Sequence, residues 1–196
     1  YLFWAPAYFQ DQFGYRASSG MGMALIVTLY AIVTVISIFG GYLPKLFVEK
    51  KGMHPYSGRM LAMLIFAFFP LFALFAQPMG QYSAWWPAII IGLAGAGHQA
   101  WSANLFSTIG DMFPKSSIAT ITGIGGMAGG VGSMILQWVA GDLFVYAGET
   151  NMEFMGFTGK PAGYFVIFCV CAVAYLLGWI IMKSLVPKYK PIILEK

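Results

Sequence analysis

The sequence has 196 residues, of which 59% are hydrophobic and only 9% are charged. A soluble domain carries about 25% charged residues, and a soluble fold of this length cannot hide so much apolar surface. The composition therefore excludes a soluble globular protein and predicts a chain whose natural solvent is lipid. The net charge of +4 becomes informative only through the positions of the basic residues.

The first apolar stretch, residues 1–9, is too short to cross a membrane. A spanning helix needs about 20 apolar residues, and this stretch runs directly into Gln10 and Asp11. We therefore interpret residues 1–10 as the end of a helix whose first part is absent. A signal-peptide remnant is the alternative, but no basic segment precedes the stretch and no A-x-A cleavage site ends it.

Five longer apolar stretches follow, and each is predicted to form a complete membrane-spanning helix. They cover residues 20–43, 60–76, 84–108, 116–141 and 161–183. A turn-forming cluster at residues 77–81 separates the second stretch from the third. Backbone groups inside hydrocarbon must be satisfied within their own segment, and no stretch alternates with the period of a barrel strand. The expected fold class is an all-α membrane protein.

The basic residues fall almost entirely at one set of helix ends. Nine of them belong to two loops and the C-terminal tail: Lys45, Lys50, Lys51, Arg59, Lys115, Lys183, Lys188, Lys190 and Lys196. The opposite ends carry only Arg16 and Lys160. Because cytoplasmic loops are enriched in Lys and Arg, this distribution agrees with five crossings and predicts a cytoplasmic C-terminus.

The predicted helices divide into two apolar helices and three with a polar face. Residues 60–76 and 164–182 are apolar all round, which is typical of helices that face lipid or other helices. The polar faces comprise Tyr30, Thr34, Ser37 and Gly41 on the first helix, His98, Gln99, Trp101, Ser102, Asn104 and Thr108 on the third, and Thr122, Gly126, Gly129, Gly130, Ser133 and Gln137 on the fourth. This division predicts a polar interior, as in a transporter or channel. The rings of charge that form a channel filter are not evident.

His98 is the sole imidazole within a predicted span. Polar residues at this depth are costly and usually functional. We expect His98 to donate a hydrogen bond to a substrate or to carry a proton; the alternative is a histidine that only packs helices together. No Asp, Glu, Lys or Arg lies deep within the complete spans, so groups that pair with an anion or a coupled proton would lie elsewhere.

The other candidates for a substrate site lie around His98. Asn104 and Ser102 offer donors and acceptors, and Trp101 offers a flat face for a sugar ring; interhelical hydrogen bonding is the alternative. The predicted site consists of His98, Gln99, Trp101, Ser102, Asn104, Tyr30, Thr34 and Gln137. The side chains of His98, Trp101 and Asn104 are expected to share one polar cavity with Tyr30 and Thr34. A stripe of small residues is expected to pack against another helix: Ala96, Ala100, Ala103 and Ser107.

Motifs that suggest other chemistry are rejected. Residues 123–128 match the dinucleotide fingerprint G-x-G-x-x-A, but that fingerprint requires a preceding strand in a βαβ unit. The pairs Gly125/Gly129 and Gly126/Gly130 instead suit helix packing or a hinge. His98 and Ser102 lie one turn apart, but no third catalytic group or G-x-S-x-G turn accompanies them. No metal-ligand spacing is present. We therefore expect no enzyme, no cofactor, no metal and no nucleic-acid partner.

Several motifs together match a known family. They are G-H-Q-A-W-S-A-N-L-F at residues 97–106, D-M-F-P-K at 111–115 and G-I-G-G-M-A-G at 123–129, with L-F-W-A-P at 2–6 and G-G-Y-L at 40–43. With these motifs the sequence resembles the hexuronate transporters, bacterial members of the anion:cation symporter family within the major facilitator superfamily. The resemblance covers nearly the whole chain.

The resemblance implies the C-terminal six-helix half of a twelve-helix major facilitator fold, with the N-terminal half absent. In that family helices seven, eight, ten and eleven line a cavity between the halves, and helices nine and twelve lie outside it. The family's coupling acids and carboxylate-binding arginine belong to the first half, and no residue here matches them. Some relatives carry an asparagine in the eleventh helix, which residues 123–130 lack.

The implied function is proton-coupled symport of a hexuronate or a related organic anion by alternating access in the bacterial inner membrane. The partners would be a small anionic substrate, protons, the lipid bilayer and the N-terminal half of the transporter. Two alternatives stay open. One is a transporter of another organic anion, such as an aromatic acid or tartrate, and the other is a membrane protein of the same fold that does not transport.

Overall fold

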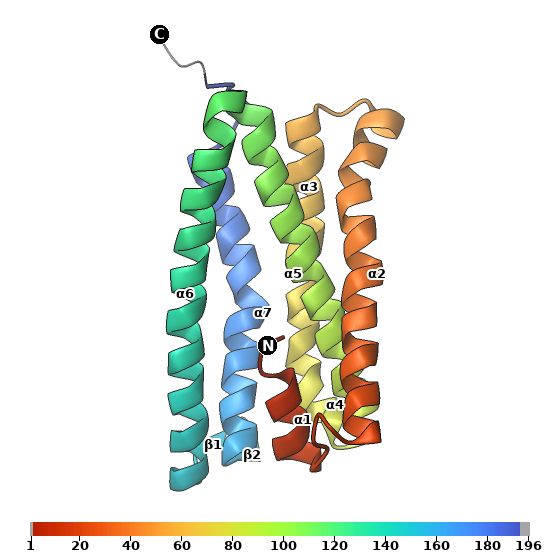
Figure 1. Cartoon of the computed structure of the whole chain (residues 1–196), viewed down its shortest axis with the longest axis vertical. Helices are drawn as coiled ribbons and strands as arrows, with labels where there is room; N and C mark the ends of the chain where they lie inside the picture. The colour runs from red at the N-terminus through yellow and green to blue at the C-terminus, as the bar shows by residue number, and fades with distance from the viewer. Residues whose placement is uncertain (1, 193–196) are drawn as a thin grey trace.

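The apolar stretches form long helices that lie side by side in a bundle (Figure 1). A computed structural model describes residues 2–192, so Tyr1 and Lys196 lie outside the described residues. The elements are α1 (Ala5–Phe13), α2 (Gly20–Lys51), α3 (Pro55–Ala67), the 3₁₀ helix η1 (Phe69–Phe75), α4 (Ala76–Gly80), α5 (Trp85–Met112), α6 (Lys115–Thr150), the strands β1 (Glu153–Phe154) and β2 (Phe157–Thr158), and α7 (Lys160–Leu185). The predicted all-α membrane class is confirmed.

Two helices run well past their predicted ends at residues 43 and 141. α2 begins where the Ser19 Oγ accepts from the Gly22 N–H at 3.1 Å, and it continues to Gly52, whose φ of 61° ends it. α6 continues to Asn151, which caps it with a φ of 49°. The predictions stopped at the first charged residue, but a helix that leaves hydrocarbon continues until a residue in the left-handed region ends it.

The second predicted span is not one continuous helix over residues 60–76. It begins earlier, at Pro55, and changes to 3₁₀ geometry over Phe69–Phe75 before it continues as α4. Pro70 explains the change, because proline removes one backbone donor and its ring crowds the preceding turn. Most of the cluster at residues 77–81 is also helical, and the chain turns at the end of the cluster, at Gln81–Tyr82.

A short hairpin that the sequence analysis did not predict joins α6 to α7. Glu153 pairs with Thr158 and Phe154 with Phe157. The two residues between them, Met155 and Gly156, have φ values of 47° and 85°, as a tight two-residue hairpin turn requires. The hairpin is too short to contribute a sheet to the core.

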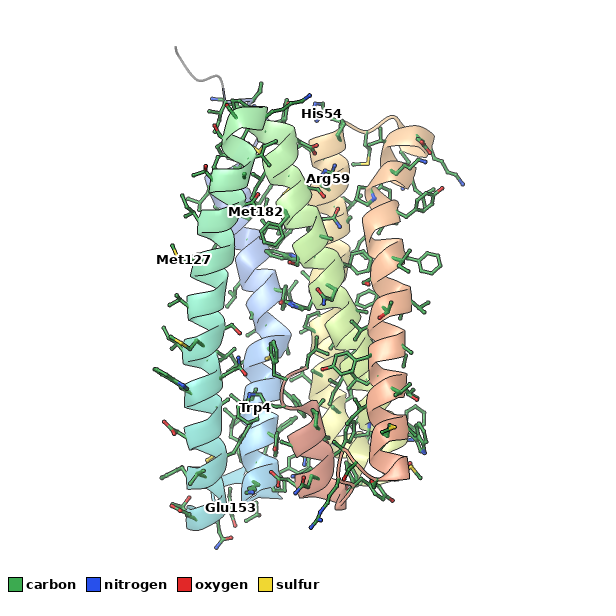
Figure 2. All side chains as sticks on the ribbon, in the orientation of Figure 1. Trp4, His54, Arg59, Met127, Glu153 and Met182 are labelled. Atoms are coloured by element: carbon green, nitrogen blue, oxygen red, sulfur yellow. The ribbon has the colours of Figure 1, made fainter. Side chains whose placement is uncertain are left out.

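α5 packs mainly against α2, α3 and η1, and it also contacts α4 and α6. Among residues 2–192, four segments are long and apolar enough to cross a membrane: Gly20–Lys51, Pro55–Gly80, Lys115–Thr150 and Lys160–Leu185. With 28 residues α5 is also long enough to cross a membrane, but its polar residues distinguish it from these four segments. The outer faces of α2 and α6 expose many apolar side chains, and Met127 points away from the bundle (Figure 2).

The two ends of the bundle carry different loops. His54 and Arg59 lie at one end, the end from which the C-terminal tail emerges, and Glu153 lies at the other (Figure 2). This arrangement matches the two sets of helix ends into which the basic residues were sorted. Which end faces the cytoplasm stays a prediction from the charge distribution.

Candidate functional site

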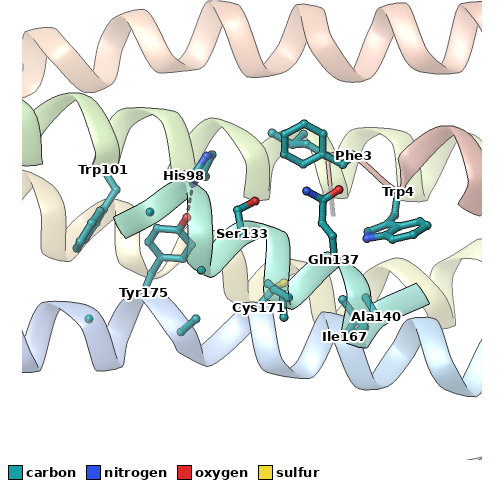
Figure 3. Close-up of a pocket in the computed structure, with 16 residues that line it drawn as sticks. Phe3, Trp4, His98, Trp101, Ser133, Gln137, Ala140, Ile167, Cys171 and Tyr175 are labelled. Atoms are coloured by element: carbon teal, nitrogen blue, oxygen red, sulfur yellow. Dashed lines mark hydrogen bonds between the residues drawn. The ribbon is translucent and has the colours of Figure 1, made fainter. Parts of the chain in front are cut away.

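A cavity of about 430 Å³ lies between α5, α6, α7 and the residues that precede α1 (Figure 3). His98, Ser133 and Cys171 each lie near the middle of their own helix, so the cavity lies at mid-depth in the bundle. Transporters commonly hold their substrate at this depth. The volume is within the range of about 300–1,000 Å³ that small-molecule sites occupy.

The lining combines flat aromatic faces with a few polar groups. The aromatic members are Phe3, Trp4, Trp101 and Tyr175, and the polar members are His98, Ser133 and Gln137. Such a lining can stack against a ring while polar atoms fix its orientation. No Asp, Glu, Lys or Arg lines the cavity within the part of the chain that the structure describes.

His98 and Trp101 on α5 meet Tyr175 on α7. The His98 Nδ1 and the Tyr175 hydroxyl are hydrogen-bonded to each other (Figure 3). The ring centroids of Trp101 and Tyr175 lie 5.4 Å apart, with an interplanar angle of 79°. The Trp101 Nε1 is buried and has no hydrogen-bond partner among residues 2–192.

α6 supplies the opposite wall. Ser133 and Gln137 are four residues apart, so they share one face of the helix, and both point into the cavity (Figure 3). Gly129 and Gly132 extend this wall, and a Cβ at either would meet no atom within 4 Å. The glycines therefore keep this wall free of side chains.

Three residues of the predicted site line this cavity: His98, Trp101 and Gln137. The structure does not bring Tyr30 and Thr34 to it. Both are exposed on α2, where the Tyr30 hydroxyl donates to the Leu2 carbonyl at 3.2 Å and the Thr34 hydroxyl donates to the Tyr30 carbonyl. Gln99 and Ser102 lie on α5 but outside the lining.

The expectation that Asn104 points into the same cavity is wrong. Its side chain is 1% exposed, and its Nδ2 donates to the carbonyls of Gly40 on α2 and Ala100 on α5, at 3.0 and 2.8 Å. Its neighbour on this face, Thr108, is also buried. Ala103, which was predicted to pack, is exposed instead. Ala96 and Ala100 of the predicted stripe are buried, so the packing face of α5 combines part of that stripe with Asn104 and Thr108.

The glycine pairs of α6 are not packed against another helix within the described chain. A Cβ at Gly125, Gly126, Gly129 or Gly130 would have no neighbour within 4 Å. Of the residues on α6, only Ala140, Phe144 and Ala147 are buried. No helix among residues 2–192 covers these glycines, so their use in helix packing or as a hinge stays a prediction.

α7 contributes more to the cavity than its sequence suggested. It was expected to lie outside, yet Ile167, Cys171 and Tyr175 line the cavity. Periodicity could not reveal this, because an apolar helix gives no contrast between a cavity face and a lipid face. The hydroxyl of Tyr175, within the apolar helix, was the feature of the sequence that could have indicated a cavity face on α7.

Charged groups gather at the two ends of the bundle. At one end the Arg59 Nε contacts an Asp111 carboxylate oxygen at 2.5 Å. At the other, Asp11 accepts from the Lys160 Nζ at 3.3 Å and from the Tyr164 hydroxyl at 2.9 Å. Both pairs join helices that are distant in sequence. No cluster of residues suited to hold a metal ion is found among residues 2–192.

Comparison with known proteins identifies relatives. Residues 1–137 match the family model of the Major Facilitator Superfamily. The hexuronate transporters of Escherichia coli strain K12 and of Escherichia coli O157:H7 are each 26% identical to the chain over 189 residues. The alignment covers 92% of this chain but 38% of each transporter, so the chain spans well under half of their length. No solved structure matches the chain.

Proposed function

Because the chain belongs to the major facilitator superfamily, we propose that it forms the C-terminal half of a secondary active transporter for a hexuronate. The transporter would work by alternating access in a bacterial inner membrane and would couple uptake to protons. The single observation that carries the proposal is a cavity at mid-depth with both aromatic and hydrogen-bonding walls. The similarity to two hexuronate transporters supports a hexuronate as the proposed substrate.

The lining suits a polyhydroxylated ring. The faces of Trp4 and Trp101 can pack against the C–H face of a sugar, and His98, Ser133 and Gln137 can bond its hydroxyl groups. The Ser133 hydroxyl and the Gln137 carboxamide can each supply a donor and an acceptor, which matches a ligand whose hydroxyl groups do both.

The negative charge of a hexuronate requires a further partner. Neither an Arg nor a Lys lines the cavity in the described chain, and a carboxylate buried without a partner is costly. We infer that the cationic group and the proton-carrying acid belong to an N-terminal half that packs against this one. α6 is largely uncovered along its glycine-rich part, which is consistent with such a partner.

An aromatic acid is the second candidate substrate. Four aromatic side chains line the cavity, and they would stack on a benzoate-like ring as readily as on a sugar. Sugar and aromatic acids differ in their hydroxyl groups, so loss of the polar wall should weaken only the binding of the sugar acid.

The test is uptake of labelled glucuronate by the full-length protein in right-side-out membrane vesicles, with and without an imposed proton gradient. We expect gradient-driven uptake that unlabelled galacturonate inhibits and benzoate does not. Gln137→Ala should raise KM about five- to tenfold, as the loss of one hydrogen bond to the ligand predicts. Gln99→Ala is the matched control, because Gln99 is exposed and lies outside the lining. Inhibition by benzoate alone would favour the aromatic acid, and absence of uptake would reject the proposal.

A further inference from the structure

Tyr175 occupies an unusual position for a residue on an apolar helix. Its hydroxyl is hydrogen-bonded to the Nδ1 of His98, across 77 residues of sequence. Its ring lies edge-on to two other rings, at 72° and 5.7 Å from His98 and at 79° and 5.4 Å from Trp101. One side chain on α7 therefore contacts both aromatic residues that α5 presents to the cavity.

The hydrogen bond to Nδ1 determines what the other nitrogen of His98 can do. A neutral imidazole has one nitrogen that donates and one that accepts, and the partner of the first nitrogen sets the role of the second. Because a phenol is a good donor, we assign the donor role in this bond to the Tyr175 hydroxyl, which places the proton of the ring on Nε2. The Nε2 has no hydrogen-bond partner among residues 2–192, and His98 lines the cavity.

We propose that Tyr175 is a positioning residue, which holds His98 as the Nε2–H tautomer and so presents a hydrogen-bond donor to a ligand oxygen. The edge-on contacts fix the planes of His98 and Trp101, so the donor and the stacking face keep a constant relative orientation. This inference rests on the proposed function for the nature of the ligand, a sugar acid. The tautomer itself depends only on residues of this chain.

The chemistry favours an oxygen-rich anion over a cationic ligand. A neutral imidazole that offers N–H cannot also accept at that nitrogen, so the site recognises carboxylate, hydroxyl or carbonyl oxygens. On the opposite wall, Ser133 and Gln137 point into the cavity and can also donate to such oxygens.

The direct test is nitrogen NMR of the full-length protein with ¹⁵N-labelled imidazole rings. The difference between the spectra of wild type and His98→Gln isolates the His98 signals. We expect an unprotonated Nδ1 and a protonated Nε2 in the wild type, and a mixture of tautomers in Tyr175→Phe. Tyr146→Phe, at an exposed tyrosine of α6, is the matched control and should leave the spectrum unchanged. A protonated Nδ1 in the wild type would overturn the proposal without reference to any variant.

Transport measurements then test the role of the donor. In Tyr175→Phe we expect KM for glucuronate to rise about three- to tenfold with little change in the maximal rate. If Tyr175 only stabilised the fold, Tyr175→Phe would reduce the amount of folded protein. The maximal rate would then fall, and KM would stay unchanged. Unchanged KM and an unchanged His98 spectrum in Tyr175→Phe would reject the positioning role even where the wild type transports glucuronate. Absence of uptake by the wild type would reject the proposed function, while the NMR result would still decide the tautomer.

Discussion

Asn104 on α5 donates a hydrogen bond to the Gly40 carbonyl, the carbonyl that Pro44 on α2 leaves without its helical partner. In an α-helix the N–H of residue 44 would bond to the carbonyl of residue 40, and proline has no N–H. The Asn104 Nδ2 takes the place of that donor at 3.0 Å. This bond explains why an asparagine is fully buried at the interface between α2 and α5.

We predict that Asn104→Ala destabilises the protein by about 1–2 kcal/mol, because it leaves a buried carbonyl unsatisfied. In a Pro44→Ala background the backbone N–H of residue 44 is restored, and the same substitution should cost much less. The measurement is a double-mutant cycle on thermal unfolding in detergent. Additive effects of the two substitutions would contradict the coupling. Ser107→Ala is the control, since its hydroxyl bonds only within its own helix.

A second prediction concerns the close approach of α2 and α5. A Cβ at Gly40 would lie 2.1 Å from the Ala100 Cβ, and neither atom belongs to a flexible side chain. Gly40→Ala should therefore force the helices apart and destabilise the protein by about 1–3 kcal/mol. Ala100→Gly in the same chain should recover much of this loss. The control is Gly110→Ala near the end of α5, where the Cβ meets nothing within 4 Å and a gain of up to about 1 kcal/mol is expected from helix propensity. Equal effects at positions 40 and 110 would be inconsistent with the packing described.

The helices were predictable from the sequence because apolar stretches without charge have few other structures available in lipid. Their ends were less predictable. The charge at Asp142 marks where α6 can leave hydrocarbon, whereas the helix ends only at Asn151. The break at Pro70 had a visible cause in the sequence, but its 3₁₀ geometry depends on packing around that proline.

The candidate site was predictable only in part. His98 and Gln137 were identified because polar residues in an apolar span are costly and therefore conspicuous. Asn104 was assigned to the cavity because helical spacing cannot distinguish a residue that binds a ligand from one that satisfies a backbone carbonyl. The orphan carbonyl at Gly40 could have been inferred from Pro44 four residues later, but its partner depends on how α2 and α5 pack.

A third prediction concerns the ion pair that joins α3 to the end of α5. The Arg59 guanidinium contacts Asp111 through Nε at 2.5 Å and Nη2 at 3.4 Å, and the side chains are 24% and 29% exposed. We expect Asp111→Asn to lower the free energy of unfolding by about 1 kcal/mol. This loss lies between those expected on breaking an exposed and a buried ion pair. Arg59→Lys should not substitute fully, because lysine cannot form two parallel contacts.

The control for the ion pair is Glu49→Gln, which removes an exposed partner of Lys45 on α2. We expect no measurable change in the unfolding temperature of that variant, since pairs in water contribute little. If Glu49→Gln and Asp111→Asn unfold at the same temperature as the wild type, the contact at Arg59 does not stabilise the bundle. Unfolding at several salt concentrations adds a further check, because a partly buried pair is screened less than an exposed one.

The last prediction is the orientation of the bundle in the membrane. The end that carries His54 and the C-terminal tail holds most of the basic residues, and the opposite end holds the hairpin at Met155. Because Lys and Arg are retained in the cytoplasm, we expect Met155→Cys to react with an impermeant maleimide in intact cells. His54→Cys should react only after the membrane is permeabilised. Both residues are exposed, so the membrane alone determines which of the two cysteines the reagent reaches. Cys169→Ser and Cys171→Ala remove the native thiols from the background. The reverse pattern of labelling would show that the distribution of charge misidentifies the cytoplasmic side.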